Sequence, residues 1–216
     1  MDSDHKIFYA QWQINSHTLA WNANGGELSG DYTQGSVEYG TEIVRPIAER
    51  EGYTFDGWNT YAEAVDSIEI STMPDNDIEY FAIWKVNKYT IAWNMNNGTD
   101  SVFATTSINY ADTIKAPQAQ PERTDYWFKG WSATETGQAI DSFGLMPATN
   151  IAFFAVWEAS LYEAIWMVNN GTDAIFATTQ ASANTTLVAP DSIPQRENYT
   201  FIGWSTSDNG SPMNDI

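Results

Sequence analysis

Nine of the ten tryptophans recur along the chain in three columns, and no other feature restricts the possible fold as strongly. Within each column, successive tryptophans are 72 or 73 residues apart. Self-similarity at a fixed period is typical of tandem copies of one structural unit. The columns are Trp12, Trp84 and Trp157; Trp21, Trp93 and Trp166; and Trp58, Trp131 and Trp204. The 216 residues therefore indicate three small units in tandem.

Short motifs accompany the columns. The third column ends three aromatic segments, at residues 52–58 (GYTFDGW), 125–131 (DYWFKGW) and 198–204 (NYTFIGW). The second column precedes turn sequences at residues 24–26 (NGG), 96–98 (NNG) and 169–171 (NNG). The first column ends apolar segments at residues 6–12 (KIFYAQW), 78–84 (IEYFAIW) and 151–157 (IAFFAVW). Short apolar segments separated by turn residues are typical of β-strands.

Each repeat is therefore expected to contain several short strands. First strands are predicted at residues 18–22, 90–94 and 163–167, and second strands near residues 36–39, 106–110 and 178–183. Each Tyr-x-Phe-x-Gly-Trp segment is predicted as a further strand, with room beyond it for one helical turn at most. The predicted fold class is mainly β, or α+β at most, in three tandem repeats of 72–73 residues.

The last strand of each repeat, which we call the closing strand, is apolar on both faces. In residues 78–84 one face carries Ile78, Tyr80, Ala82 and Trp84, and the other carries Phe81 and Ile83. A strand with two apolar faces is expected inside a sheet or between two layers.

Composition excludes several classes of partner. Nine Lys and Arg against 28 Asp and Glu give a net charge of −19, which argues against nucleic acid and anionic membranes. No apolar run approaches the roughly 18 residues of a membrane span, so no membrane insertion is expected. The absence of cysteine and the presence of only two histidines argue against disulfides, metal sites built from cysteine or histidine, and catalytic triads. No cofactor is expected.

The Asn-Gly-Gly turn, the Gly-Tyr-Thr-Phe-x-Gly-Trp segment and the closing aromatic-Ala-x-Trp strand together resemble the Listeria-Bacteroides repeat family, which includes the B repeats of internalin-type surface proteins. The resemblance covers nearly the whole chain. It implies a compact β-grasp-like unit, carried in tandem on secreted or cell-surface proteins as a stalk or adhesive module, without catalytic residues. Asp125 and Asn198 replace the first glycine of the Gly-Tyr-Thr-Phe-x-Gly-Trp motif, and Thr99 and Thr172 replace Gly26. The turns therefore need not match in detail.

The motif order places the repeat boundaries inside the chain. Residues 1–15 are expected to be an orphan closing strand, residues 16–86 repeat 1, residues 87–159 repeat 2, and residues 160–216 an incomplete repeat 3 whose closing strand is missing. The chain is then permuted relative to its own repeat.

This permutation generates a hypothesis about assembly. Residues 1–14 of one molecule are expected to complete repeat 3 of a neighbour, head to tail. The interface would use Ile7, Phe8, Tyr9, Ala10 and Trp12 of the donor, with Trp166 and Trp204 of the acceptor. Such a heterologous contact propagates a filament unless a ring closes. The alternative is that the sequence is an excerpt of a longer array, continuous through both ends; both give the same fibre geometry.

Three further features have competing interpretations. Asn97, Asn170, Asn184 and Asn198 fit the N-glycosylation sequon, but Asn-Gly is also good turn sequence. Arg50, Arg123 and Arg196 each precede a third-column tryptophan by eight residues, and we expect them to pair with a carboxylate or stack on a ring rather than bind a ligand. Trp127 lies outside the columns and could stack on a sugar or fill a gap.

The preferred function is an extracellular, cell-surface structural or adhesive repeat protein. Its expected partners are copies of itself and a host or surface glycan or protein. A carbohydrate-binding module is the alternative. An enzyme is not expected, because no non-repeated polar cluster stands out.

Overall fold

The computed structural model describes residues 6–172 and 174–213. These residues form twelve strands and no helix, which confirms the mainly β fold class, while the likeness to a β-grasp unit stays a prediction. The chain divides into two compact units. The first runs to Ile91 and includes Thr106–Ile114 and Phe143–Ile151; the second comprises Ala92–Thr105, Lys115–Ser142 and the residues from Ala152 onward. We keep the names repeat 1, 2 and 3 for the segments predicted from sequence.

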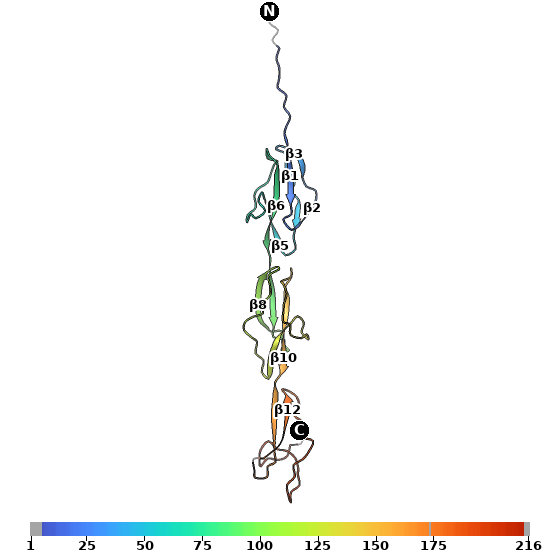
Figure 1. The fold of residues 1–216 in the computed structure, drawn as a ribbon, viewed down its shortest axis with the longest axis vertical. Helices are drawn as coiled ribbons and strands as arrows, with labels where there is room; N and C mark the ends of the chain where they lie inside the picture. Colours follow the sequence, from blue (N-terminus) through green and yellow to red (C-terminus); the bar gives the residue numbers. More distant parts are fainter. Residues whose placement is uncertain (1–5, 173, 214–216) are drawn as a thin grey trace, which may run out of the picture. The chain divides into compact units, whose positions relative to one another are not determined.

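Repeat 1 is built on a four-stranded sheet with the order β3-β1-β6-β5 (Figure 1). Its strands are β1 (Ser16–Asn22), β3 (Gly35–Glu38), β5 (Tyr53–Asn59) and β6 (Ile78–Val86). The closing strand β6 pairs in parallel with β1 and antiparallel with β5. It therefore lies inside the sheet, as its two apolar faces predicted.

Repeat 2 has a second four-stranded sheet, with the order β8-β7-β10-β9. Its strands are β7 (Lys88–Asn94), β8 (Val102–Asn109), β9 (Tyr126–Ser132) and β10 (Ile151–Ala159). The order is that of repeat 1, with β10 as the interior closing strand. A small sheet of β2 (Glu27–Ser29) and β4 (Ile47–Glu49) in repeat 1 was not predicted.

The column tryptophans form the core of these repeats. Trp58, Trp93 and Trp131 are each at most 3% exposed. Trp21 meets Trp58 edge to face with ring centroids 4.6 Å apart, and Trp93 meets Trp131 in the same way at 5.1 Å. Fully burying a large apolar side chain contributes about 1.5–3 kcal/mol. Repetition of the tryptophans therefore follows from repetition of the core.

The described part of repeat 3 contains one antiparallel pair, β11 (Leu161–Met167) and β12 (Ile175–Ser182). The strand predicted at its Tyr-x-Phe-x-Gly-Trp segment is wrong, because residues 199–204 are not in a strand. The reason lies in the pairing: β5 and β9 pair with the closing strands β6 and β10. The described part of repeat 3 has no closing strand, so this segment has no ladder to join.

One residue connects each repeat to the next through two backbone hydrogen bonds. Asn87 donates its N–H to the Gly52 carbonyl (2.9 Å) and accepts from the Tyr110 N–H (2.8 Å) within the first compact unit. In the second compact unit, Ser160 does the same with Asp125 and Ala183, at 2.8 Å each. The junction geometry therefore recurs with the repeat.

The turn that accepts this bond needs a positive φ. Gly52 has φ 76°, and its counterparts Asp125 and Asn198 adopt 66° and 61°, so the turns match despite the departures from glycine. Asp and Asn tolerate this region better than most residues. At Gly52 the Tyr110 ring fills the space that a Cβ would need. The counterpart of Tyr110 is the small Ala183, which suits the side chain of Asp125.

We predict that Gly52→Ala destabilises repeat 1 by about 1–2 kcal/mol through its backbone and by about 1–3 kcal/mol more through the displaced Tyr110 ring. Urea unfolding followed by tryptophan fluorescence measures the change. Gly40→Ala is the matched control, because Gly40 has φ 78° and open space around it. Equal losses in the two variants would contradict the role of Tyr110.

We also predict that Tyr80, which lies on β6 and is 5% exposed, makes the free energy of unfolding depend on pH. Burial raises its pKa above the ordinary value of 10.0, because the fold disfavours the phenolate. The stability that this difference provides is complete below pH 10 and is lost as the pH rises through the folded-state pKa. Tyr80→Phe, which introduces the residue of the equivalent Phe153, should flatten the fall in unfolding free energy above pH 10. The exposed Tyr61→Phe is the control, and identical pH profiles for the two variants would refute the assignment.

Candidate functional site

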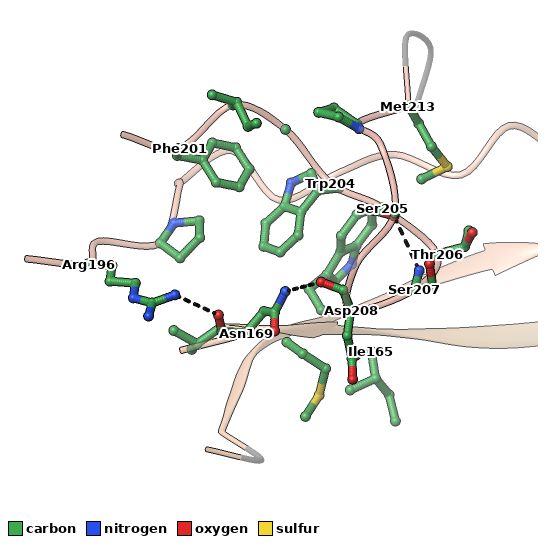
Figure 2. Close-up of a pocket in the computed structure, with 18 of the residues that line it drawn as sticks. Ile165, Asn169, Arg196, Phe201, Trp204, Ser205, Thr206, Ser207, Asp208 and Met213 are labelled. Atoms are coloured by element: carbon green, nitrogen blue, oxygen red, sulfur yellow. Dashed lines mark hydrogen bonds between the residues drawn. The ribbon is translucent and has the colours of Figure 1, made fainter. Parts of the chain in front are cut away.

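An open groove of about 620 Å³ lies in repeat 3 (Figure 2). One wall comes from β11 and the turn after it, including Trp166, Val168 and Asn169. The other comes from residues 194–213, including Phe201 and Trp204. Both predicted acceptor residues are therefore in the groove, and the rings of Trp166 and Trp204 meet edge to face at 4.9 Å.

The groove occupies the place that the closing strand holds in the complete repeats. In repeat 1 the strand β6 lies between β1 and β5, and the corresponding segments of repeat 3 are β11 and residues 199–205. Burial reflects the difference: Trp58 and Trp131 are 2% and 3% exposed, whereas Trp204 is only half-buried. The described part of repeat 3 thus presents an uncovered strand site.

The second wall is not a strand, but it keeps two backbone features of its counterparts. Gly203 has φ 136°, close to 126° at Gly57 and 137° at Gly130. The Met213 N–H donates to the Trp204 carbonyl (2.8 Å), as the Ile140 N–H does to Trp131 (2.9 Å). Local turns therefore arrange this wall before any strand is added.

An asparagine side chain marks the edge of the groove. In repeat 1 the Asn24 Nδ2 donates to the Ala62 carbonyl (2.8 Å) and to the Ala82 carbonyl of the closing strand (3.0 Å). Asn96 makes the same two bonds, to Glu135 (2.8 Å) and Ala155 (2.9 Å). Among the described residues, Asn169 donates to Asp208 at 3.0 Å and to no closing strand.

The sequence did not reveal this role of the asparagines. Asn24 begins an Asn-Gly-Gly turn, whereas Asn96 and Asn169 begin Asn-Asn-Gly turns. All three have φ between 48° and 51°, so turn chemistry alone explains the residue type. Their shared position three residues after a second-column tryptophan was the available signal.

The predicted donor residues lie in an exposed segment that precedes β1. Ile7, Phe8, Tyr9 and Trp12 are 72%, 87%, 78% and 92% exposed, and Ala10 is also exposed. Residues 6–14 pair with no strand in the part of the chain that the structure describes. Residues 1–5 of the predicted donor segment lie outside the described residues.

The three repeated arginines stack on tyrosine rings, which confirms their structural interpretation. The guanidinium carbon lies 3.9 Å from the ring centroid of Tyr53 for Arg50, 3.8 Å from that of Tyr126 for Arg123, and 4.0 Å from that of Tyr199 for Arg196. Arg50 and Arg196 also donate to the carbonyls of Asn24 (3.1 Å) and Asn169 (3.4 Å). Arg50 and Arg196 therefore each fasten an aromatic segment to the turn that follows a second-column tryptophan.

The sequon asparagines take part in turns. The Asn97 Oδ1 accepts from the Thr99 N–H (3.2 Å) and hydroxyl (2.7 Å), and Asn170 holds Thr172 in the same way. Asn184 and Asn198 are exposed and have positive φ. Glycosylation at these four positions stays a prediction.

Trp127 and Tyr162 are exposed aromatic side chains outside the repeated core. Trp127 on β9 is 67% exposed. Tyr162 donates its hydroxyl to the Asp125 carboxylate at 2.6 Å, and this bond raises the pKa of Tyr162. Within residues 6–172 and 174–213 no metal-binding cluster of His, Asp and Glu is found, and no helix is long and apolar enough to cross a bilayer.

Comparison with known proteins agrees with the family resemblance of the sequence motifs. The family model of the Listeria-Bacteroides repeat domain matches residues 17–83, 89–156 and 162–215. Two proteins of Evansella cellulosilytica are similar: one, provisionally named as a membrane protein, is 33% identical over 97% of this chain, and the other, provisionally named as a Gly-rich membrane protein, is 30% identical over 94%. Internalin H of Listeria monocytogenes is 31% identical over 65% of the chain.

The chain spans 31%, 23% and 25% of the length of these three relatives. The family match covers most of all three predicted repeats, including the one whose groove is open. The chain belongs to the Listeria-Bacteroides repeat family.

Proposed function

We propose that this chain is a structural or adhesive segment of a cell-surface protein, and that its copies assemble head to tail by strand complementation. Residues 6–14 of one copy fill the groove of repeat 3 in the next. The observation that carries the proposal is the uncovered strand site in repeat 3, in a chain whose own residues 6–12 have a closing-strand sequence and are exposed. The names of the membrane-protein and internalin relatives support a surface location.

The donor segment has the exposed apolar side chains and the unpaired backbone of a closing strand. Phe8, Tyr9 and Trp12 are largely exposed, and burying each would contribute about 1.5–3 kcal/mol. The closing strands β6 and β10 each lie between two neighbouring strands, so an inserted strand gains a hydrogen-bonded ladder on both sides. Unpaired strand edges are the usual site of such β-augmentation.

The contact is heterologous, because donor and acceptor are different surfaces of the molecule. Its repetition produces an open filament unless the rotation per subunit closes a ring. Each copy carries a formal charge of −19, so copies repel one another over about 10 Å at 0.1 M salt. Assembly should therefore strengthen as salt is added.

We predict that the wild-type chain associates with rising concentration, and that Phe8→Ala combined with Trp12→Ala leaves it monomeric. Both side chains are exposed in the isolated chain, so their removal should not affect folding. Sedimentation velocity across a hundredfold concentration range measures the association.

The matched control is Trp127→Ala, which removes an exposed tryptophan of another surface. It should associate like wild type. A wild-type chain that stays monomeric throughout, or a Phe8/Trp12 variant that associates normally, would refute the proposal.

Carbohydrate binding is a second candidate because Trp127 is exposed, and the equivalent positions of the other repeats carry threonine. An exposed indole can stack on a sugar ring. A glycan array measures this activity, and binding that is lost in Trp127→Ala would support it. Equal binding by the two proteins would argue against a role for this side chain.

A further inference from the structure

We infer that the groove of repeat 3 accepts the donor segment in one register, in which Phe8 lies opposite Trp166, Ala10 opposite Trp204 and Trp12 opposite Phe201. The inference rests on the proposed function and specifies which contacts select the incoming strand. It follows from the pairings of the two complete repeats and from the 72–73-residue spacing.

The inserted strand must fit the groove most closely at its alanine, Ala10. Ala82 and Ala155 are 0% exposed, and each lies directly opposite a third-column tryptophan, Trp58 or Trp131. The equivalent donor residue is Ala10, and the equivalent tryptophan is Trp204. A larger side chain at this position would collide with packed rings, and overpacking of this kind typically costs about tenfold or more in an equilibrium constant.

Aromatic contacts flank the alanine. Tyr80 packs on Trp21 with ring centroids 5.2 Å apart, and Phe153 stacks on Trp93 at 4.9 Å. The equivalent pair in the assembly is Phe8 on Trp166. Toward the other end of the strand, Trp84 meets Phe55 at 5.5 Å and Trp157 meets Phe128 at 5.7 Å. Trp12 would meet Phe201 in the same way.

Two polar contacts fix the position along the strand. The Trp84 Nε1 donates to the Ala23 carbonyl (2.9 Å), and the Trp157 Nε1 donates to the Met95 carbonyl (2.7 Å). Trp12 would donate to the equivalent carbonyl of Val168. The Asn169 Nδ2, which already donates to Asp208, would give its second hydrogen to the Ala10 carbonyl, as Asn24 and Asn96 do to Ala82 and Ala155.

The same register also rebuilds the junction between repeats. Asn15 occupies the position of Asn87 and Ser160, and its carbonyl already accepts from the Tyr39 N–H at 2.9 Å. Its own N–H would donate to the Asn198 carbonyl of the acceptor, as Asn87 and Ser160 do to Gly52 and Asp125. The joint between two copies would therefore be equivalent to the joint within one chain.

Neighbouring positions of the donor provide a sharp test, because adjacent side chains of a strand point to opposite faces. A slip of one residue would turn every donor side chain to the other face. Gln11 is equivalent to the buried Ile83 and the half-buried Val156, so this position accepts an apolar side chain. Ala10→Leu and Gln11→Leu therefore form a matched pair in an exposed segment.

Sedimentation equilibrium of the full chain measures the dissociation constant for each variant. We expect Ala10→Leu to weaken association at least about tenfold and Gln11→Leu to bind as tightly as wild type or more tightly. Asn169→Gly, which keeps the positive φ and removes the amide, should also weaken association, whereas Asn24→Gly in repeat 1 should leave it unchanged.

The two proposals fail in different ways. If wild type associates but both leucine variants weaken equally, or Gln11→Leu weakens more, the register is wrong and the assembly stands. If wild type does not associate at any concentration, the assembly is rejected, and the register with it.

Discussion

The two halves of each complete repeat depend on the closing strand that lies between them. In repeat 1, β1 and β3 come from the first half, β5 from the second, and β6 pairs with both β1 and β5. Because β5 pairs only with β6 in this sheet, β5 can join the sheet only when β6 is present. The aromatic core depends on it equally, because Tyr80, Ala82 and Trp84 project among the column tryptophans and phenylalanines.

The described part of repeat 3 shows what forms without a closing strand. Its first half forms the β11–β12 hairpin, and the described residues of its second half keep local turns and the Arg196 stack without forming a strand. Local interactions thus organise each half, whereas the closing strand joins the halves. A groove that is arranged by its own turns and lined by tryptophans pays less ordering entropy when a strand enters.

The sequence predicted those features that depend on local pattern. Short apolar segments bounded by turn residues located the first and second strands, and the tryptophan columns identified the core. The repetition of the arginines favoured carboxylate pairing or ring stacking over ligand binding, and the structure shows ring stacking. The strand at residues 199–204 was predicted wrongly because its residue pattern equals that of β5 and β9, while its state depends on a partner elsewhere.

Other features could not be predicted from the local sequence pattern. Strands β2 and β4 have three residues each, too few to show alternation. The fit of the Tyr110 ring over Gly52 joins residues 58 positions apart, and only the fold brings them together. In the candidate site, Trp166 and Trp204 were predicted from the columns, whereas the bond from Asn169 toward the strand site needed the comparison with Asn24 and Asn96.

Hydrogen–deuterium exchange of residues 6–14 at increasing protein concentration tests the central claim most directly. The account predicts that these amides exchange fast in dilute solution and slowly in concentrated solution, and that residues 199–205 of the groove become protected in parallel. Fast exchange of residues 6–14 at every concentration, or protection that does not depend on concentration, would contradict it.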